Sequence, residues 1–286
     1  MPPMESASSD PLESNPTIVL IHGLWMTPRS WEHWKERYEQ RGYDVLTPAY
    51  PGFEVEVEAL REDPSPIANA NVSDILAHLE SVIRELDRPP FLMGHSYGGL
   101  LTQLLLDRGL GAAGVAIDSA PPEGIRKVPL AQFRALFPAF ENPANRHREV
   151  PFTAKHFHYA FTNTLSEEES AEVYERYHIA APGRLIWDGF LSNVKPGHQE
   201  TWVNFENDDR APLLFIAGSV DHVMPAAVNR SNFKHYKSAA HTDYKEFEGR
   251  SHFTVGQPGW EEVADYALDW CNEHTGRAEL SIGAVA

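Results

Sequence analysis

A serine flanked by glycines is the residue of this sequence best prepared for chemistry. Residues 94–98 read Gly-His-Ser-Tyr-Gly, after an apolar run that begins at Phe91 and before a helix-forming run over 100–106. A strand that turns this sharply into a helix pushes Ser96 towards positive φ, at a cost of about 1–3 kcal/mol. The glycines, which carry no Cβ, let the two elements approach closely. The hydroxyl then projects into a cleft beside the backbone N–H of Tyr97, which can stabilise a developing negative charge.

The elements that position this serine alternate between short apolar runs and amphipathic ones, which predict strands and helices respectively. The expected strands are 17–21, 43–47, 91–93, 114–117, 212–217 and 243–247, and the expected helices between them are 28–41, 71–86, 100–106, 225–236 and 260–272, with an irregular segment over 53–68. Such alternation indicates an α/β fold, a parallel sheet covered by helices on both faces. Ligands of these sheets bind beyond the carboxyl ends of the strands.

Polar motifs follow four of the predicted strands at that same edge. Residues 22–25, His-Gly-Leu-Trp, follow the first strand and Ser96 follows the third. Asp221 lies beyond the strand 212–217, and His252 follows the last strand. The four motifs are therefore expected to meet at one edge of the sheet, with serine, aspartate and histidine in that chain order.

With these motifs in this order, residues 17–272 resemble the α/β-hydrolase fold superfamily of serine hydrolases. The resemblance implies Ser96 as nucleophile, His252 as general base and acid, and Asp221 as the carboxylate that orients His252. The residue types suit these roles. An imidazole with an ordinary pKa of about 6.5 can take the serine proton near neutrality, and a buried carboxylate fixes its tautomer.

The resemblance also implies an oxyanion hole made by the backbone N–H groups of Leu24 and Tyr97. Only the short motif 22–25 is present here, in place of the longer glycine-rich loop of some lipases. A typical member of the superfamily has two further strands before its His-Gly motif, whereas sixteen polar residues precede Thr17. We therefore expect a reduced sheet of about six parallel strands.

Two of these assignments have rivals in the sequence. Asp118 follows the fourth strand, a position that some members use for the acid, so it remains the alternative to Asp221. His222 adjoins the acid too closely to reach it, and His241 precedes the last strand at the wrong end of the sheet. His22 is expected to support the oxyanion loop.

Residues 123–210 have a different texture, because they are rich in aromatic residues and contain no convincing strand. Helices are expected over 130–137, 155–161, 166–177 and 185–191, and Ser166 with Glu169 forms a capping box. We interpret the segment as a helical cap inserted into a core of residues 17–122 and 211–275. Its aromatic side chains would make an apolar roof that excludes water. The residues expected to contact substrate are His22, Trp25, Phe133, Phe137, Phe157, Phe161, Trp187 and Phe253.

The composition of the chain excludes several classes of binding partner and indicates a compartment. The net charge of −17 argues against nucleic acid and against an anionic membrane surface. Cys271 is the only cysteine, which fits a reducing compartment and favours the cytoplasm, and no apolar run is long enough to span a membrane. Residues 1–16 are expected to form a disordered arm that does not resemble a secretory signal, and residues 276–286 a loose tail.

The nucleophile narrows the reaction. Members of the superfamily that open epoxides or displace halides use aspartate at the elbow, so Ser96 indicates acyl transfer to water. The sequence predicts hydrolysis of a small to medium, apolar carboxylic ester or lactone, with no metal and no organic cofactor required. Two alternatives stay open: carbon–carbon hydrolysis, a lyase reaction or perhydrolysis by the same residues, and a small-molecule receptor that does not depend on turnover. The sequence leaves the oligomeric state undetermined.

Overall fold

The computed structural model describes residues 15–276. The expected tail after Gly276 and all but the last two residues of the expected arm lie outside this range. Within it, no helix is both long enough and apolar enough to cross a membrane.

The centre of the molecule is one six-stranded sheet, which confirms the predicted α/β fold. The strand order is β2-β1-β3-β4-β7-β8, and every neighbouring pair is parallel. The strands are β1 Ile18–Ile21, β2 Val45–Leu46, β3 Phe91–His95, β4 Ala113–Ile117, β7 Leu213–Gly218 and β8 Thr242–Phe247. The parallel arrangement brings all the strand carboxyl ends to one edge, where the predicted polar motifs follow.

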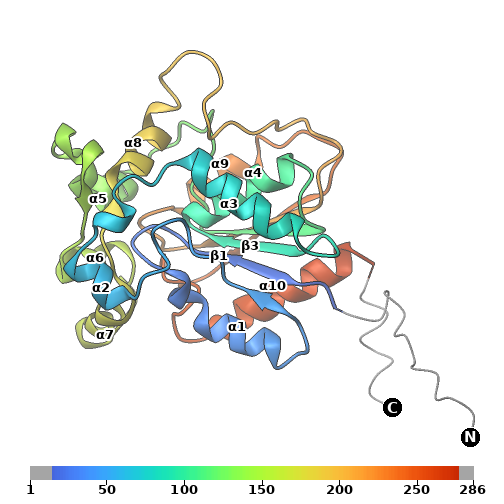
Figure 1. Ribbon diagram of the computed structural model, residues 1–286, viewed down its shortest axis with the longest axis horizontal. Helices are drawn as coiled ribbons and strands as arrows, with labels where there is room; N and C mark the ends of the chain where they lie inside the picture. Colours follow the sequence, from blue (N-terminus) through green and yellow to red (C-terminus); the bar gives the residue numbers. More distant parts are fainter. Residues whose placement is uncertain (1–14, 277–286) are drawn as a thin grey trace, which may run out of the picture.

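Helices cover both faces of this sheet (Figure 1). On one face lie α1 and α10, which bury a cluster of tryptophan, tyrosine and aliphatic side chains against it. On the other face lie α3, α4 and α9. Their bounds are α1 Glu32–Glu39, α3 Val72–Arg84, α4 Tyr97–Asp107, α9 Ala226–Phe233 and α10 Trp260–His274.

Helix α3 shows how the sequence dictates such an element. Its buried residues recur at helical spacing and are Val72, Ile75, Leu76, Leu79 and Ile83. Asn71 caps its start by accepting a hydrogen bond from the N–H of Asp74. Each fully buried aliphatic side chain of this stripe contributes about 1.5–3 kcal/mol relative to exposure.

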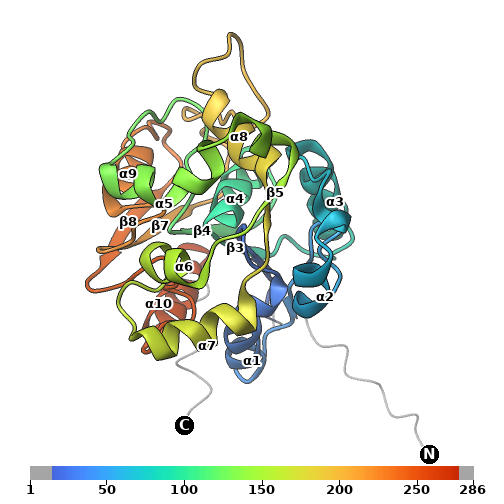
Figure 2. The same ribbon diagram turned by 90° about the vertical axis from the view of Figure 1, so that its left-hand side faces the viewer.

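Residues 123–210, called the insertion below, leave the sheet after β4 and return at β7. Its helices are α5 Leu130–Phe140, α6 Ala154–Ala160, α7 Glu167–Tyr177 and α8 Gly183–Leu191. They lie together at one end of the molecule (Figures 1 and 2). The expected capping box of α7 is present, with both Ser166 and Glu169 engaged. All four helices expected from the sequence are therefore observed.

The structure corrects two expectations for local structure. The segment 53–68, expected to be irregular, contains the helix α2 Val57–Glu62 and a short 3-10 turn at Ser65–Ile67. Helix α2 is six residues long and buries only Val57 and Leu60, so too little periodicity stands out among the neighbouring prolines. The insertion also holds a two-stranded antiparallel pair, β5 Glu149–Val150 with β6 Ala181–Pro182. Strands of two residues leave no readable alternation in a sequence.

Candidate active site

Ser96 occupies the sharp turn between β3 and α4. Its φ of 55° is one of three positive values found for non-glycine residues between 15 and 276, which confirms the strained turn read from the sequence. The backbone N–H of Ser96 donates to the carbonyl of Ile117, the last residue of the adjacent strand β4. The turn is thus fixed by the sheet beside it, and the side chain is directed to the edge where the strands end.

The two glycines of the motif are required by the close packing of the turn. A Cβ on Gly94 would lie 2.0 Å from the carbonyl oxygen of Gly98, inside the following helix. A Cβ on Gly98 would lie 2.1 Å from the carbonyl oxygen of Ile21 in β1. Both obstacles are backbone atoms, so neither position can accept a side chain without moving the sheet or the helix.

Ser96, His252 and Asp221 form one hydrogen-bonded chain. The Oγ of Ser96 lies 3.0 Å from Nε2 of His252, and Nδ1 of His252 lies 2.7 Å from Oδ2 of Asp221. The His252 and Asp221 side chains are fully buried. Ser96 comes from the turn after β3, His252 from the loop after β8 and Asp221 from the loop after β7, so the parallel sheet brings them together.

Hydrogen bonds hold the Asp221 side chain in place. Its Oδ1 accepts the backbone N–H groups of Val223 at 2.6 Å and Met224 at 2.9 Å, while Oδ2 faces His252. Together these contacts fix the position of both carboxylate oxygens. The group is therefore oriented so that His252 carries its Nδ1 proton towards Asp221 and presents Nε2 to the serine.

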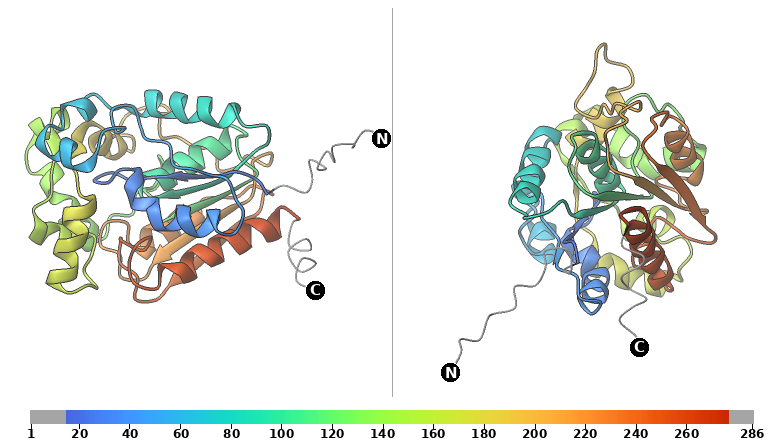
Figure 3. Two further views of the ribbon diagram at one scale, coloured as in Figure 1. Left: turned by 60° about the horizontal axis from the view of Figure 1, so that its bottom comes forward. Right: turned by 90° about the vertical axis from the view of Figure 1, so that its right-hand side faces the viewer.

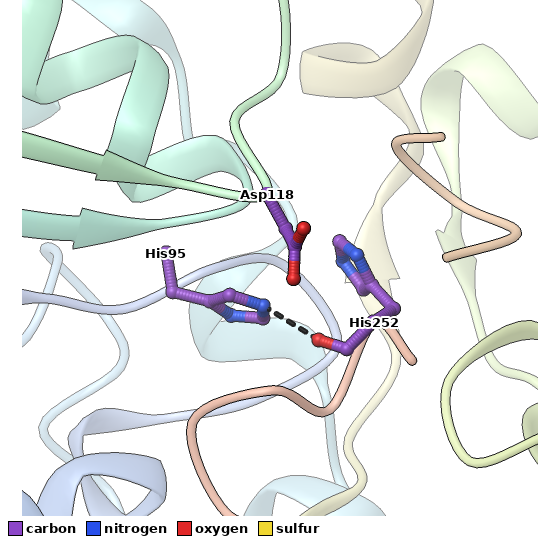
Figure 4. A group of neighbouring side chains, drawn as sticks. All are labelled: His95, Asp118 and His252. Atoms are coloured by element: carbon purple, nitrogen blue, oxygen red, sulfur yellow. Dashed lines mark hydrogen bonds between the residues drawn. The ribbon is translucent and has the colours of Figure 1, made fainter. Parts of the chain in front are cut away.

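Asp118, the alternative acid, lies beside this chain but is not part of it. It follows β4 with a φ of 43°, and its Oδ1 accepts the N–H of Gly218 at 2.7 Å. Its buried Oδ2 has no partner of good hydrogen-bond geometry among residues 15–276, although the hydroxyl of Thr254 and the carboxyl of Asp221 lie close enough to affect its pKa. Figure 4 shows its carboxyl group directed towards the imidazole rings of His95 and His252.

The surroundings of Asp118 favour its neutral form. Burial, together with the nearby carboxylate of Asp221, raises the pKa of Asp118 well above its ordinary value. Its carboxyl group therefore keeps its proton at pH values at which an exposed aspartate has lost it. Asp221 beside it accepts hydrogen bonds from Val223, Met224 and His252.

Two further buried histidines stand near the serine, and both are held neutral. Burial lowers the pKa of His22 to about 4, and its Nδ1 lies 2.8 Å from the carbonyl of Gly23 while its ring stacks on Tyr50. Burial, with the nearby His252, lowers the pKa of His95 well below its ordinary value. The Nε2 of His95 lies 2.8 Å from the backbone carbonyl of His252, which fixes the loop that carries this residue (Figure 4).

The backbone N–H groups of Leu24 and Tyr97 are free to bind an anion. Neither donates to a protein acceptor in residues 15–276, and Tyr97 is the first residue of α4, whose N–H has no partner within the helix. The conformation of the loop around Leu24 is set by its neighbour Trp25, which has a φ of 64°. Such a pair of donors beside a serine can stabilise an oxyanion.

The insertion contacts both the loop that holds Trp25 and the loop that holds His252. The indole N–H of Trp25 donates to the carbonyl of Val150 at 2.9 Å, and its ring stacks on Phe152 with centroids 4.4 Å apart. The carbonyl of Phe161 accepts the N–H of Phe253 at 2.9 Å, and its ring packs edge-on against that of His252. The geometry of the site therefore depends on contacts between segments more than 90 residues apart.

A cavity of about 280 Å³ opens at Ser96, between the core and the insertion. Its lining is predominantly apolar, and the polar side chains in it include Ser96, Lys127, Gln132 and Asn193. The apolar residues that the sequence did not single out include Leu100, Ile125, Leu136, Phe140, Leu185, Ile186, Phe190 and Met224. The aromatic richness of the insertion pointed to such a lining, but helical periodicity alone does not say which face meets the core.

The predicted substrate contacts divide into two groups. Trp25, Phe133 and Trp187 line the cavity, whereas the other candidates do not. Those placed elsewhere are His22, Phe137, Phe157, Phe161 and Phe253. Of these, Phe157 and Phe161 are fully buried and stack on each other at 4.9 Å, so they form the interior of the insertion.

His95, Asp118 and His252 place one potential metal ligand each within 4.8 Å. Both ring nitrogens of His252 are engaged, one by Ser96 and one by Asp221. A metal ion here would have to displace one of these hydrogen bonds. The arrangement is better suited to moving a proton between a hydroxyl and an imidazole than to metal binding.

Comparisons with known proteins show the family and the fold. The chain belongs to the alpha/beta hydrolase family, whose sequence pattern matches residues 18–266. No curated protein matches the sequence.

Solved structures of similar fold include several ester-cleaving enzymes. A monoacylglycerol lipase from Paleococcus ferrophilus is 21% identical with a TM-score of 0.63, and the match covers 91% of this chain and 96% of the lipase. A methylesterase from Arabidopsis is 12% identical with a TM-score of 0.63 over 90% and 98%. A pyrethroid hydrolase from Sphingobium faniae is 16% identical with a TM-score of 0.62 over 90% and 97%. At these identities the likeness establishes the fold alone.

Proposed function

We propose that the protein is a serine hydrolase that cleaves a small to medium, apolar carboxylic ester or lactone through an acyl-enzyme. One observation carries the proposal: the continuous hydrogen-bonded chain from Ser96 through His252 to Asp221. The family to which the chain belongs and its ester-cleaving structural neighbours support it. The single cysteine, Cys271, is buried, and we propose a reducing compartment, the cytoplasm, on that basis.

The first half-reaction follows from the geometry. Nε2 of His252 takes the hydroxyl proton as Oγ of Ser96 attacks the ester carbonyl, and the resulting imidazolium is stabilised by Asp221. The carbonyl oxygen becomes an oxyanion that accepts the N–H groups of Leu24 and Tyr97, each worth about 3–4 kcal/mol in the transition state. The intermediate then collapses, the alcohol leaves with the proton from His252, and the acyl group stays on the serine.

The second half-reaction repeats these steps with water. His252 removes a proton from water, which attacks the acyl-enzyme, and the same N–H groups bind the second oxyanion. The protonated imidazole returns its proton to Oγ as the acid departs. A lactone follows the same course, except that the alcohol remains tethered to the product.

The cavity supports an apolar acyl or alcohol group. The cavity has a volume of about 280 Å³, and its mostly apolar lining offers few hydrogen-bond partners to a polar substrate. We propose that the insertion acts as a cap, because α5 and α8 supply nine of the residues that line this cavity. Water excluded by such a cap strengthens the electrostatic interactions of the transition state.

A substrate panel tests the proposed reaction. p-Nitrophenyl esters of increasing acyl length and simple lactones should be hydrolysed by wild-type protein and not by Ser96→Ala. Gly189→Leu adds a side chain at a cavity-lining position where an added Cβ meets no atom within 4 Å, with Gly189→Ala as the matched control. The leucine variant should raise KM for long acyl chains and leave acetate turnover unchanged.

The same panel separates the alternatives. Cleavage of activated diketones without ester hydrolysis would indicate carbon–carbon hydrolysis and contradict the proposal. Tight binding of small apolar ligands with no turnover of any ester would indicate a receptor. Equal effects of Gly189→Leu and Gly189→Ala on every ester would show that substrates do not enter this cavity.

A further inference from the structure

A second cluster of ligand-type side chains lies at the opposite end of the sheet from Ser96. His241 directly precedes β8, Asp243 is the second residue of that strand, and His274 is the last residue of α10. One ring nitrogen of each histidine and one carboxylate oxygen of Asp243 lie within 4.8 Å of one another. Figure 3 shows α10 beneath the sheet beside this edge strand.

Neighbouring groups fix the orientation of two of these side chains. The Nδ1 of His274 lies 2.8 Å from the carbonyl oxygen of Trp270, so this nitrogen carries the proton and Nε2 is left as the acceptor. The indole N–H of Trp270 donates to Oδ2 of Asp243 at 2.8 Å. Metal-binding histidines and carboxylates are held in this way by hydrogen bonds from outside the site.

When His274 is neutral, two acceptor atoms of the cluster face each other. Its Nε2 lone pair faces Oδ2 of Asp243 at 3.6 Å, so two acceptors oppose each other with no proton between them. The ring of His274 also stacks on that of His241, with centroids 4.5 Å apart. The Nε2 of His241 lies 2.9 Å from the same Oδ2, and the guanidinium of Arg210 binds the backbone carbonyl of His241 at 3.1 Å.

A bound cation would resolve this arrangement, and the spacing suits one. Zinc bonds of about 2.0–2.1 Å in tetrahedral geometry separate neighbouring ligand atoms by roughly 3.3 Å. The two histidine–carboxylate separations, 2.9 Å from His241 and 3.6 Å from His274, lie on either side of that value. Two imidazoles and a carboxylate are the donor set of borderline divalent ions.

We propose that His241, Asp243 and His274 bind a divalent transition-metal ion, with Zn²⁺ as the best fit and water in the remaining position. About half of the His241 side chain is exposed, which leaves the ion access from solvent. The ion would tie the end of α10 to the edge strand β8. It would therefore stabilise the fold without taking part in chemistry at Ser96, and the proposal is independent of the function proposed above.

Binding should depend on pH in a defined direction. The Nε2 atoms of both histidines must be unprotonated to bind the ion, so protons are released on binding. Affinity should therefore be higher at pH 8 than at pH 6. The charged and titratable groups near the ion include the three ligands, Arg210, which binds the carbonyl of His241, and Tyr266, which interacts electrostatically with Asp243.

Calorimetric titration of Zn²⁺ into untagged, chelator-treated, full-length protein tests the site. We expect one ion per chain, a higher melting temperature with Zn²⁺, and at least about a tenfold loss of affinity in His274→Ala and His241→Ala. His235→Ala is the matched control, because this exposed histidine also binds a backbone carbonyl but has no carboxylate partner among the described residues. Ester hydrolysis should be equal in all four proteins.

Cobalt gives a readout that does not depend on folding of a variant. Co²⁺ added to wild-type protein should give the absorption of a four-coordinate site, and Zn²⁺ should abolish it. Absence of saturable binding by wild-type protein would overturn the proposal. Equal affinity of wild type and His274→Ala, with both proteins folded by circular dichroism, would also overturn it.

Discussion

Asn in place of Asp221 should disable the site by reversing one hydrogen bond. The asparagine carbonyl can keep the bonds that Oδ1 now accepts from Val223 and Met224. Its amide N–H₂ then faces Nδ1 of His252, which must become an acceptor and shift its proton to Nε2. A protonated Nε2 cannot take the proton of Ser96. A triad in the wrong tautomer loses about 10⁴-fold in kcat, or about 5.4 kcal/mol at 1.36 kcal/mol per tenfold.

Asp118→Asn is the matched comparison for this variant. The asparagine Oδ1 can accept the N–H of Gly218 as the carboxyl does now, and its amide replaces a neutral acid group. We expect kcat/KM to stay within about tenfold of wild type, or about 1.4 kcal/mol. The acid limb of the pH–rate profile should keep its position, because no charge near His252 is lost.

Steady-state hydrolysis of a p-nitrophenyl ester between pH 5 and 9 measures both variants. A large loss in Asp118→Asn with a small one in Asp221→Asn would make Asp118 the orienting acid and refute our assignment. An acid limb shifted to lower pH in Asp118→Asn would show that Asp118 is ionised in the wild type, because removing a nearby negative charge makes His252 less basic.

Three further predictions concern stability and the oxyanion loop. The pKa of Asp118 in the folded protein lies above its unfolded value of about 3.9. Wild-type stability therefore falls as the pH rises from the unfolded pKa to the folded pKa. The thermal midpoint of Asp118→Asn should exceed that of the wild type at pH 7, by a margin that shrinks towards pH 4. A margin independent of pH would contradict the neutral-acid interpretation. Gly98→Ala should lower the free energy of unfolding in urea by at least about 2 kcal/mol, whereas Gly189→Ala should lower it by less than about 1 kcal/mol. The reason is that only the methyl group added at Gly98 meets backbone atoms. Equal losses in the two variants would contradict this prediction. Trp25→Phe removes a hydrogen bond of about 1 kcal/mol that anchors the oxyanion loop to the insertion, so kcat should fall about fivefold, and an unchanged kcat would show that the loop holds itself.

The sequence predicted the edge of the sheet at which chemistry is possible. Ser96, Asp221 and His252 each follow a short apolar run, and a parallel sheet places the ends of such runs together. The structure brings these three side chains within hydrogen-bonding distance. The turn at Ser96 was also readable, because close backbone packing on either side of it admits only glycine.

What the sequence did not predict depends on contacts between distant segments. The hydrogen bond from Trp25 to Val150 joins residues that are far apart in the sequence, and no local pattern predicts it. Which aromatic residues line the cavity was equally unreadable, since Phe133 and Phe157 both lie on amphipathic helices but only Phe133 faces the cavity. The two-residue strands β5 and β6 and the short helix α2 carry too little periodicity to stand out.

The state of Asp118 shows the same limit. Its position after β4 made it a candidate acid, although the sequence favoured Asp221, which lies in a turn beyond its strand. The separation comes from three-dimensional contacts, because Asp221 binds His252 whereas Asp118 binds a backbone N–H of β7. Sequence order identified both carboxyls, and only the fold distinguishes their surroundings.

Labelling with a fluorophosphonate probe tests the central claim most directly. The probe reacts with a serine whose hydroxyl is activated by a base and whose oxyanion is stabilised, and peptide mapping locates the adduct. We predict one adduct, on Ser96, that forms rapidly in wild-type protein and is absent in Ser96→Ala and strongly reduced in His252→Ala. No label on Ser96, or unchanged labelling in His252→Ala, would contradict the proposed mechanism.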